Sequence, residues 1–270
     1  MFPGIVPTSG WGYHWGNGPC WDSAYVLIPW YLYLYRGDAG VMARHYEGMK
    51  RYVDYLTEKS KGGIVTEGLG DWVPPFGGPA AYTAPASLSL TGYYYQDVVI
   101  LSRIAALLGK DKDSARYSQL AEQIRTKFNA RYFDPISAIY ANGSQTALAA
   151  ALFQGLVPED RTADVLDQLL QEIRQHHGRL NCGIHGTKHL LRCLTTLGRP
   201  DVAFGVASET RHPSWGYWVE KGATTLWEFW DGRCSQNHIM FGDISAWFFE
   251  VIAGIAPDPA QPGFKNVIVH

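Results

Sequence analysis

The chain has 270 residues, a formal net charge of -2 at pH 7 and an isoelectric point near 6.5. This length suffices to bury a substantial core in one large domain or two modest ones. The charge provides no basic surface, so neither nucleic acid nor an anionic membrane is expected as a partner. No apolar run approaches the roughly 20 residues that span a bilayer. No signal-peptide pattern is visible at the N-terminus, which predicts a cytoplasmic protein.

Apolar residues recur at helical spacing through most of the chain. Successive stripes occupy residues 94–108, 117–128, 165–173 and 190–197. Gly109 and Gly198 follow the first and the last stripe, as C-capping glycines do, and the second helix is expected to start at Asp113 or Ser114. Strand patterns are limited to residues 64–65 and 267–269. The sequence therefore predicts an all-α fold.

The connections between these helices alternate in length. Short polar turns alternate along the chain with long loops rich in Trp, Gly and Pro. The short turns occupy residues 36–40, 109–113, 155–160 and 198–201. The long loops occupy residues 60–87, 130–143, 175–183 and 209–237. Short turns join antiparallel helices, so we expect helical hairpins around an axis, with all long loops at one end. Such loops are where binding residues concentrate. A ring of six hairpins needs twelve helices and only about nine or ten are visible, so the toroid is expected to be incomplete at its N-terminus.

Cysteine and histidine give no metal-site pattern. Cys20, Cys182, Cys193 and Cys234 are too dispersed for a zinc site or a disulfide framework and are expected to be buried, reduced thiols. His185 and His189 are four residues apart, but they lie in an amphipathic stretch without a third ligand, which favours a structural role. Neither a metal nor a cofactor is indicated.

The aromatic content is high, with 10 Trp, 16 Tyr and 11 Phe. Many of these residues lie in Gly- and Pro-rich loops, which suggests a surface that stacks against sugar rings. Three loop clusters, at 11–22, 68–75 and 212–238, each place a carboxylate beside indoles. Glycoside cleavage needs two carboxyl groups, and aromatic surroundings raise a carboxyl pKa toward the range of a general acid or base.

Each carboxylate has a structural alternative. Asp22 is equally suited to capping the helix that follows it. Asp71 follows two glycines that flank Leu69 and allow a close backbone approach to a ligand, which favours a site role. Glu228 is the strongest candidate, because it lies between two Trp residues without a Lys or Arg neighbour. His238 fits a core position and a site position equally well.

The third cluster resembles the signature of family 78 glycoside hydrolases, the bacterial α-L-rhamnosidases. The matching runs are His-Pro-Ser-Trp-Gly-Tyr at 212–217, Gly-Ala-Thr-Thr-Leu-Trp-Glu at 222–228, and Asn-His at 237–238 followed by Phe241-Gly242. Further stretches resemble the family at 26–30, 52–55, 70–72, 143–147 and 183–187. The resemblance covers nearly the whole chain, and the Ala-Thr-Thr-Leu-Trp-Glu run is its most specific part.

This resemblance implies an (α/α)6 toroid that hydrolyses terminal α-L-rhamnosides with inversion at the anomeric carbon. By position, Glu228 matches the general base, while Asp22 and Asp71 match acids near the site. The implied partner is a rhamnose-containing glycoside or oligosaccharide. Trp72, Trp227 and His238 match positions that line the rhamnose site. Beyond these matches, we also expect Trp21, Trp215, Trp218 and Trp230 to bind substrate.

The chain departs from the family pattern in two places. It contains no counterpart of the Asp-Cys-Pro…Arg-Asp-Glu-Arg segment that carries the general acid, which leaves Asp22 as the candidate substitute; without an acid the rate should fall by roughly 10²–10⁴. Phe229 replaces the Arg or Asp that often follows the base. Residues 262–270 resemble the start of the family's trailing β-sandwich. We therefore expect a helical catalytic domain at 1–256 and a β-sandwich start or tail at 257–270.

Two other functions remain compatible with the sequence. The first is a non-catalytic or vestigial carbohydrate-binding domain that retains the pocket. The second is another (α/α)6 enzyme, either a different exo-glycosidase or a polysaccharide lyase, although a lyase needs a basic cleft that the Trp- and acid-rich loops do not supply. An incomplete ring would also expose apolar helix faces, which predicts self-association.

Overall fold

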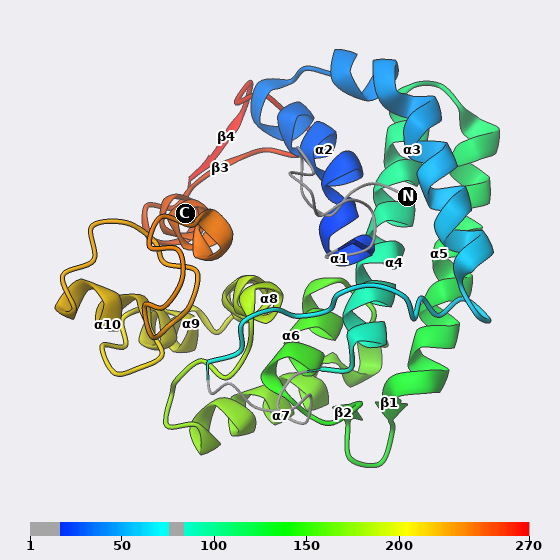
Figure 1. Cartoon of the computed structure of the whole chain (residues 1–270). Helices are drawn as coiled ribbons and strands as arrows, with labels where there is room; N and C mark the ends of the chain where they lie inside the picture. The colour runs from blue at the N-terminus through cyan, green and yellow to red at the C-terminus, as the bar shows by residue number, and fades with distance from the viewer. Residues whose placement is uncertain (1–16, 76–83, 270) are drawn as a thin grey trace. The chain divides into compact units, whose positions relative to one another are not determined.

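The computed structural model describes residues 17–75 and 84–269 (Figure 1). Residues 11–15 of the first aromatic cluster lie outside this part. The chain forms two compact units. Unit 1 comprises Met1–Gly70, Ala86–Arg131 and Gly254–His270, and unit 2 comprises Asp71–Pro85 and Tyr132–Ala253.

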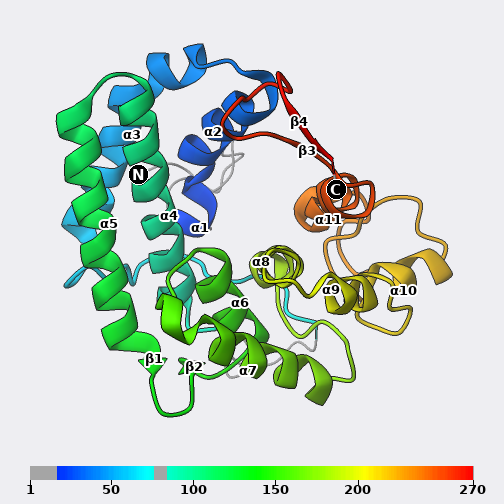
Figure 2. The ribbon, with the colours of Figure 1, turned by 180° about the vertical axis from the view of Figure 1, so that it is seen from behind.

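Unit 1 is built around one buried helix. Its elements are α1 (Pro19–Asp22), α2 (Ala24–Arg36), α3 (Gly40–Lys59), α4 (Ala86–Leu107), α5 (Asp111–Tyr132, of which the last residue belongs to unit 2), β3 (Ile255–Pro257) and β4 (Val267–Val269). Helices α1, α2 and α3 all pack against α4 (Figures 1 and 2). Helix α4 is apolar around most of its circumference, as expected for a helix covered on several sides.

Unit 2 is arranged around α8. Its elements are β1 (Phe133–Asp134), β2 (Ile139–Tyr140), α6 (Gln145–Phe153), η1 (Glu159–Arg161), α7 (Thr162–Gln175), α8 (Ile184–Thr196), α9 (Pro200–Ala207), α10 (Trp215–Glu220), η2 (Ile239–Phe241), α11 (Asp243–Trp247) and η3 (Phe248–Ile252). Helix α8 contacts α6, α9 and α11 (Figure 2). Its buried face carries Leu190, Leu191 and Leu194.

The glycines predicted to end helices do so. After α4, Gly109 adopts a left-handed φ of 69°, and Lys110 N donates to Ala105 O at 2.8 Å. After α8, Gly198 has a φ of 76°, and Arg199 N donates to Leu194 O at 2.7 Å. The short turns that follow α2, α6 and α8 join helices that pack against each other, as predicted for hairpins, and the turn after α4 leads into α5.

Helix α5 starts two residues earlier than predicted, at Asp111. Asp113 accepts hydrogen bonds from Tyr46 Oη at 2.8 Å and Lys50 Nζ at 2.9 Å instead of starting the helix. These bonds lower the pKa of the Asp113 carboxyl. The acid therefore ties α5 to α3.

Strand predictions were only partly right. Val267–Val269 forms β4, but its partner β3 (Ile255–Pro257) was missed, as was the short β1–β2 hairpin. Ile64 forms only an isolated bridge with Lys61, so residues 64–65 are not a strand. Gly263 N donates to Leu34 O at 2.8 Å and fixes the β3–β4 segment to α2 within unit 1. The proposed division at residue 256 stays a prediction.

Three of the four thiols are buried as predicted. Cys20, Cys182 and Cys193 are buried and form no disulfide bond, and burial raises the pKa of Cys193 to about 12. Cys234 is exposed, so the prediction of burial is wrong for this residue, which lies in the loop after α10. No helix within residues 17–75 and 84–269 is long and apolar enough to cross a membrane.

Candidate functional site

Asp71 is held at the N-terminus of α8. Its Oδ2 accepts hydrogen bonds from Thr146 Oγ1 at 2.6 Å and from Gly183 N at 2.8 Å. Its Oδ1 accepts from His185 N at 2.9 Å and from Gly186 N at 3.3 Å. Burial raises the pKa of Asp71, and these hydrogen bonds oppose that rise. Because both oxygens already accept two bonds, the geometry gives no support to Asp71 as a proton-transfer group.

Glu228 lies on a paired loop in unit 2. Glu228 N donates to Ser235 O at 2.9 Å, and His238 N donates to Leu226 O at 2.8 Å, so the two sides of the loop run antiparallel. Gly232 closes the loop with a φ of 79° and donates to Phe229 O at 3.0 Å. This pairing fixes the backbone on which the carboxylate is mounted.

The Glu228 carboxylate is partly exposed. Its side-chain hydrogen bond is a long one, 3.5 Å from Ser235 N. Among the residues that the structure describes, Glu228 forms no ion pair, and the nearby Arg233 pairs with Asp231 at 3.5 Å and lies over Phe229. The carboxylate is thus accessible and not held in an ion pair by the described residues.

A cluster of buried aromatic rings packs against the loop that carries Glu228. Trp218 and Trp230 stack with ring centroids 4.5 Å apart, and Trp218 Nε1 donates to Trp230 O at 3.0 Å. Trp215 Nε1 donates to Phe241 O at 3.3 Å. Trp218 and Trp230 are each only 2% exposed. Both rings are therefore core residues that hold the loop, and their contact with substrate stays a prediction.

The remaining predicted aromatic residues differ in accessibility. Trp215 and Trp227 are buried except for 8% and 9% of their surface. Trp72 and Trp21 are partly exposed. The His238 ring is also partly exposed, and its Nδ1 accepts a hydrogen bond from Met240 N at 3.4 Å, which caps η2 and fixes the ring orientation. Trp21, Trp72 and His238 therefore retain surface for a ligand.

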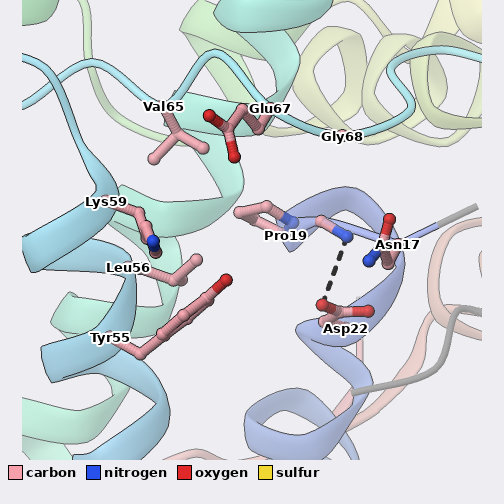
Figure 3. A pocket seen from close by; sticks show the side chains of 10 residues that line it. Asn17, Pro19, Asp22, Tyr55, Leu56, Lys59, Val65, Glu67 and Gly68 are labelled. Carbon is pink, nitrogen blue, oxygen red and sulfur yellow. Dashed lines mark hydrogen bonds between the residues drawn. The ribbon is translucent and has the colours of Figure 1, made fainter. Parts of the chain in front are cut away.

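Asp22 lines a cavity of about 200 Å³ within unit 1 (Figure 3). The cavity is bounded by Asn17, Gly18, Pro19, Asp22, Tyr55, Leu56, Lys59, Val65, Glu67 and Gly68. Asp22 is 7% exposed, and its Oδ2 accepts from Gly18 N at 3.2 Å. It does not cap α2, because Ser23 occupies that position and its hydroxyl donates to Asp97 at 2.6 Å instead. The capping alternative for Asp22 is therefore wrong.

The sequence analysis missed several polar residues around Asp22. Tyr55 and Lys59 from α3 and Glu67 from the following loop line the same cavity (Figure 3). Glu67 immediately precedes the second loop cluster, so a wider window would have included it. Asp97 is fully buried, and burial raises its pKa well above the usual value. It lies in an apolar helix and gave no sequence signal.

Two histidines lie in the core of unit 2. His185 and His189 are buried on α8, and His189 stacks on Phe153 with centroids 4.8 Å apart. Burial lowers the pKa of His185 to about 3. Within the described ranges, no group of three His, Cys, Asp or Glu side chains is placed to hold a metal ion.

The described residues form a helical domain whose long loops carry carboxylates and indoles. Residues 1–252 match the family described as the bacterial α-L-rhamnosidase six-hairpin glycosidase domain. The chain belongs to this family. The resemblance identified from the sequence and the expected all-α, (α/α)6 fold class are thereby confirmed.

Individual relatives agree with this assignment. An α-L-rhamnosidase from Streptomyces avermitilis is 32% identical over 100% of this chain and 26% of its own length. The structure of an α-L-rhamnosidase from Dictyoglumus thermophilum is similar with a TM-score of 0.86 and 39% identity over 94% of this chain and 29% of that one. The Streptomyces avermitilis enzyme complexed with L-rhamnose has a TM-score of 0.86 and 32% identity over 93% of this chain and 24% of its own. The chain thus spans less than a third of the length of these relatives.

Proposed function

We propose that this protein hydrolyses terminal α-L-rhamnosides and that Glu228 is the general base. One observation carries the proposal: the Glu228 carboxylate is accessible and forms no ion pair with the described residues, although it is mounted on a backbone fixed by pairing and by stacked indoles. Proton transfer requires a carboxylate that is held in position by a rigid backbone and is not engaged in an ion pair.

In the proposed reaction, Glu228 removes a proton from a water molecule while the water oxygen attacks the anomeric carbon. The bond between that carbon and the leaving oxygen breaks, and a carboxylic acid on the opposite face protonates the leaving oxygen. Inversion needs roughly 6.5–9.5 Å between the two carboxyl groups to accommodate the water. Asp22, which is buried and lines a cavity within unit 1, stays the candidate substitute acid.

The sugar ligand is proposed to be rhamnose. One relative has been solved as a complex with L-rhamnose. Rhamnose is an uncharged 6-deoxy sugar, so its ring presents an apolar face to an indole. In unit 2, the exposed part of Trp72 suits this stacking, and His238 suits a hydroxyl group. In unit 1, Trp21 is also partly exposed.

The test is hydrolysis of p-nitrophenyl α-L-rhamnopyranoside by the wild type and by Glu228→Gln. Loss of the base should reduce kcat by about 10²–10⁴, with rhamnose binding retained. Glu220→Gln is the matched control, because Glu220 is an exposed acid of α10 in the same unit. Proton NMR of the first product should show the β-anomer. Unchanged hydrolysis by Glu228→Gln would contradict the assignment of the base.

A non-catalytic carbohydrate-binding function is the second candidate. It is favoured by one observation: both carboxylate oxygens of Asp71 already accept two hydrogen bonds each, so among the predicted acids of unit 2 Glu228 has no second proton-transfer group. In that case rhamnose binds to the wild-type chain, but no p-nitrophenol is released. With this second function, Asp22→Asn leaves rhamnose binding unchanged. A catalytic Asp22 instead predicts that this variant loses hydrolytic activity.

A further inference from the structure

Two consecutive residues, Asp71 and Trp72, dock on the start of α8. The Asp71 carboxylate accepts three backbone N–H groups there, from Gly183, His185 and Gly186. The Trp72 carbonyl oxygen accepts a fourth, from Ile184 N at 3.0 Å. The first N–H groups of a helix have no partner inside the helix, so this segment satisfies almost the whole first turn of α8.

Helix α8 supplies no capping side chain of its own. Its N-cap residue is Gly183, and no side chain near it in sequence accepts from the first turn. Asp71 takes this role although it is separated from Gly183 by 112 positions. The carboxylate also lies at the positive end of the helix dipole. The favourable interactions of the helix terminus are therefore concentrated on the residue next to Trp72.

The fit between the two segments is close. A Cβ atom at Gly183 would lie 2.6 Å from Asp71 Oδ1 and would also collide with the Trp72 carbonyl oxygen. A Cβ atom at Gly186 would lie 3.1 Å from Asp71 Oδ2 and would collide with Thr146 Oγ1. Thr146 is fully buried and holds Asp71 from the side of α6. The backbone of residues 71–72 thus has little freedom to move.

We propose that Asp71 is a positioning residue that fixes Trp72 for contact with the sugar ring. This inference rests on the proposed function. Asp71 acts through Trp72: its own oxygens are directed to α6 and α8, whereas the Trp72 side chain is partly exposed. A displacement of a ligand-binding group by about 1 Å can reduce rates by roughly 10². A firm anchor for Trp72 therefore matters for the affinity of the site.

The experiment measures L-rhamnose affinity by calorimetry together with thermal unfolding. Asp71→Asn replaces one oxygen by an NH₂ group that faces backbone donors, and we expect affinity to fall roughly tenfold or more. Asp113→Asn is the matched control, because it breaks two side-chain bonds in unit 1 by the same substitution. It should lower stability and leave affinity within about twofold. Equal affinity losses in the two variants at similar stability would overturn the inference.

Two further comparisons separate positioning from direct contact. If Asp71 acts through Trp72, Asp71→Asn in a Trp72→Ala background should weaken rhamnose binding no further; an additional loss would overturn the inference. Should Asp71→Asn not fold, Thr146→Val removes one bond to Asp71 and should give an intermediate loss, while Thr146→Ser keeps the hydroxyl and should match the wild type. Failure of the wild-type chain to bind rhamnose would refute the proposed function itself, and this inference with it.

Discussion

Gly232 shows how a single residue supports the candidate base. Its φ of 79° disfavours side chains, and a Cβ atom would lie 2.6 Å from the Trp227 ring. Gly232→Ala should lower the free energy of unfolding by about 2–4 kcal/mol, from backbone strain and overpacking together. The loop should also lose its pairing, so kcat should fall. Urea unfolding and the p-nitrophenyl assay measure both effects.

Gly222→Ala provides the control for this prediction. Gly222 has a similar φ of 82°, but a Cβ atom there would meet nothing within 4 Å. Its substitution should therefore cost only the backbone strain, about 1 kcal/mol. If both alanine variants lose the same stability, the contact with Trp227 has no energetic importance.

At the scale of the element, α8 makes the protein sensitive to acid. Its His185 is buried and has a folded-state pKa of about 3, whereas an unfolded histidine titrates near pH 6.5. Below pH 6.5 the unfolded state therefore binds more protons than the folded state. Stability should fall by up to about 1.4 kcal/mol per pH unit until the folded pKa is reached.

Urea unfolding at pH 7, 6 and 5 tests this expectation. His185→Gln should reduce the slope, because glutamine does not titrate, while His189, whose pKa burial also lowers, keeps its own contribution. His45→Gln is the control, because His45 is exposed on α3. An unchanged slope in His185→Gln would show that burial of this ring is not the source of the acid sensitivity.

The elements that the sequence predicted are those set by local interactions. Apolar spacing located the long helices, and Gly109 and Gly198 ended α4 and α8 as predicted, because C-capping depends only on neighbouring residues. The β1–β2 hairpin escaped notice because strands of two residues carry no periodicity. Capping of α8 by Asp71 could not be predicted either, since the partner is remote in sequence.

At the scale of the whole molecule, the sequence predicted which residue types form the candidate site better than it predicted which of them are exposed. The sequence singled out Glu228 from its two Trp neighbours, and the structure describes it as accessible and without an ion pair among the described residues. The same pattern could not separate ligand-binding indoles from core indoles. Trp218 and Trp230 are buried by residues of the loop and of η2, and this depends on tertiary packing.

Exposed apolar residues lead us to expect self-association. On η3, Phe248, Phe249 and Ile252 are 45%, 68% and 52% exposed. Light scattering across a range of concentrations should show species larger than the monomer, and Phe249→Ser should reduce them. Ile136→Ser is the control, because Ile136 is 94% exposed but belongs to the β1–β2 turn and not to η3. A monomer at all concentrations would contradict the expectation.

The bond between Asp71 and the start of α8 also affects the order in which the chain folds. During synthesis, Asp71 leaves the ribosome long before Gly183, so its carboxylate remains without these partners until more than a hundred further residues have been added. Closing so long a loop is entropically slow compared with forming a local turn. The first turn of α8 should therefore be among the late parts of unit 2 to become protected, and Trp72 should reach its final place at the same step.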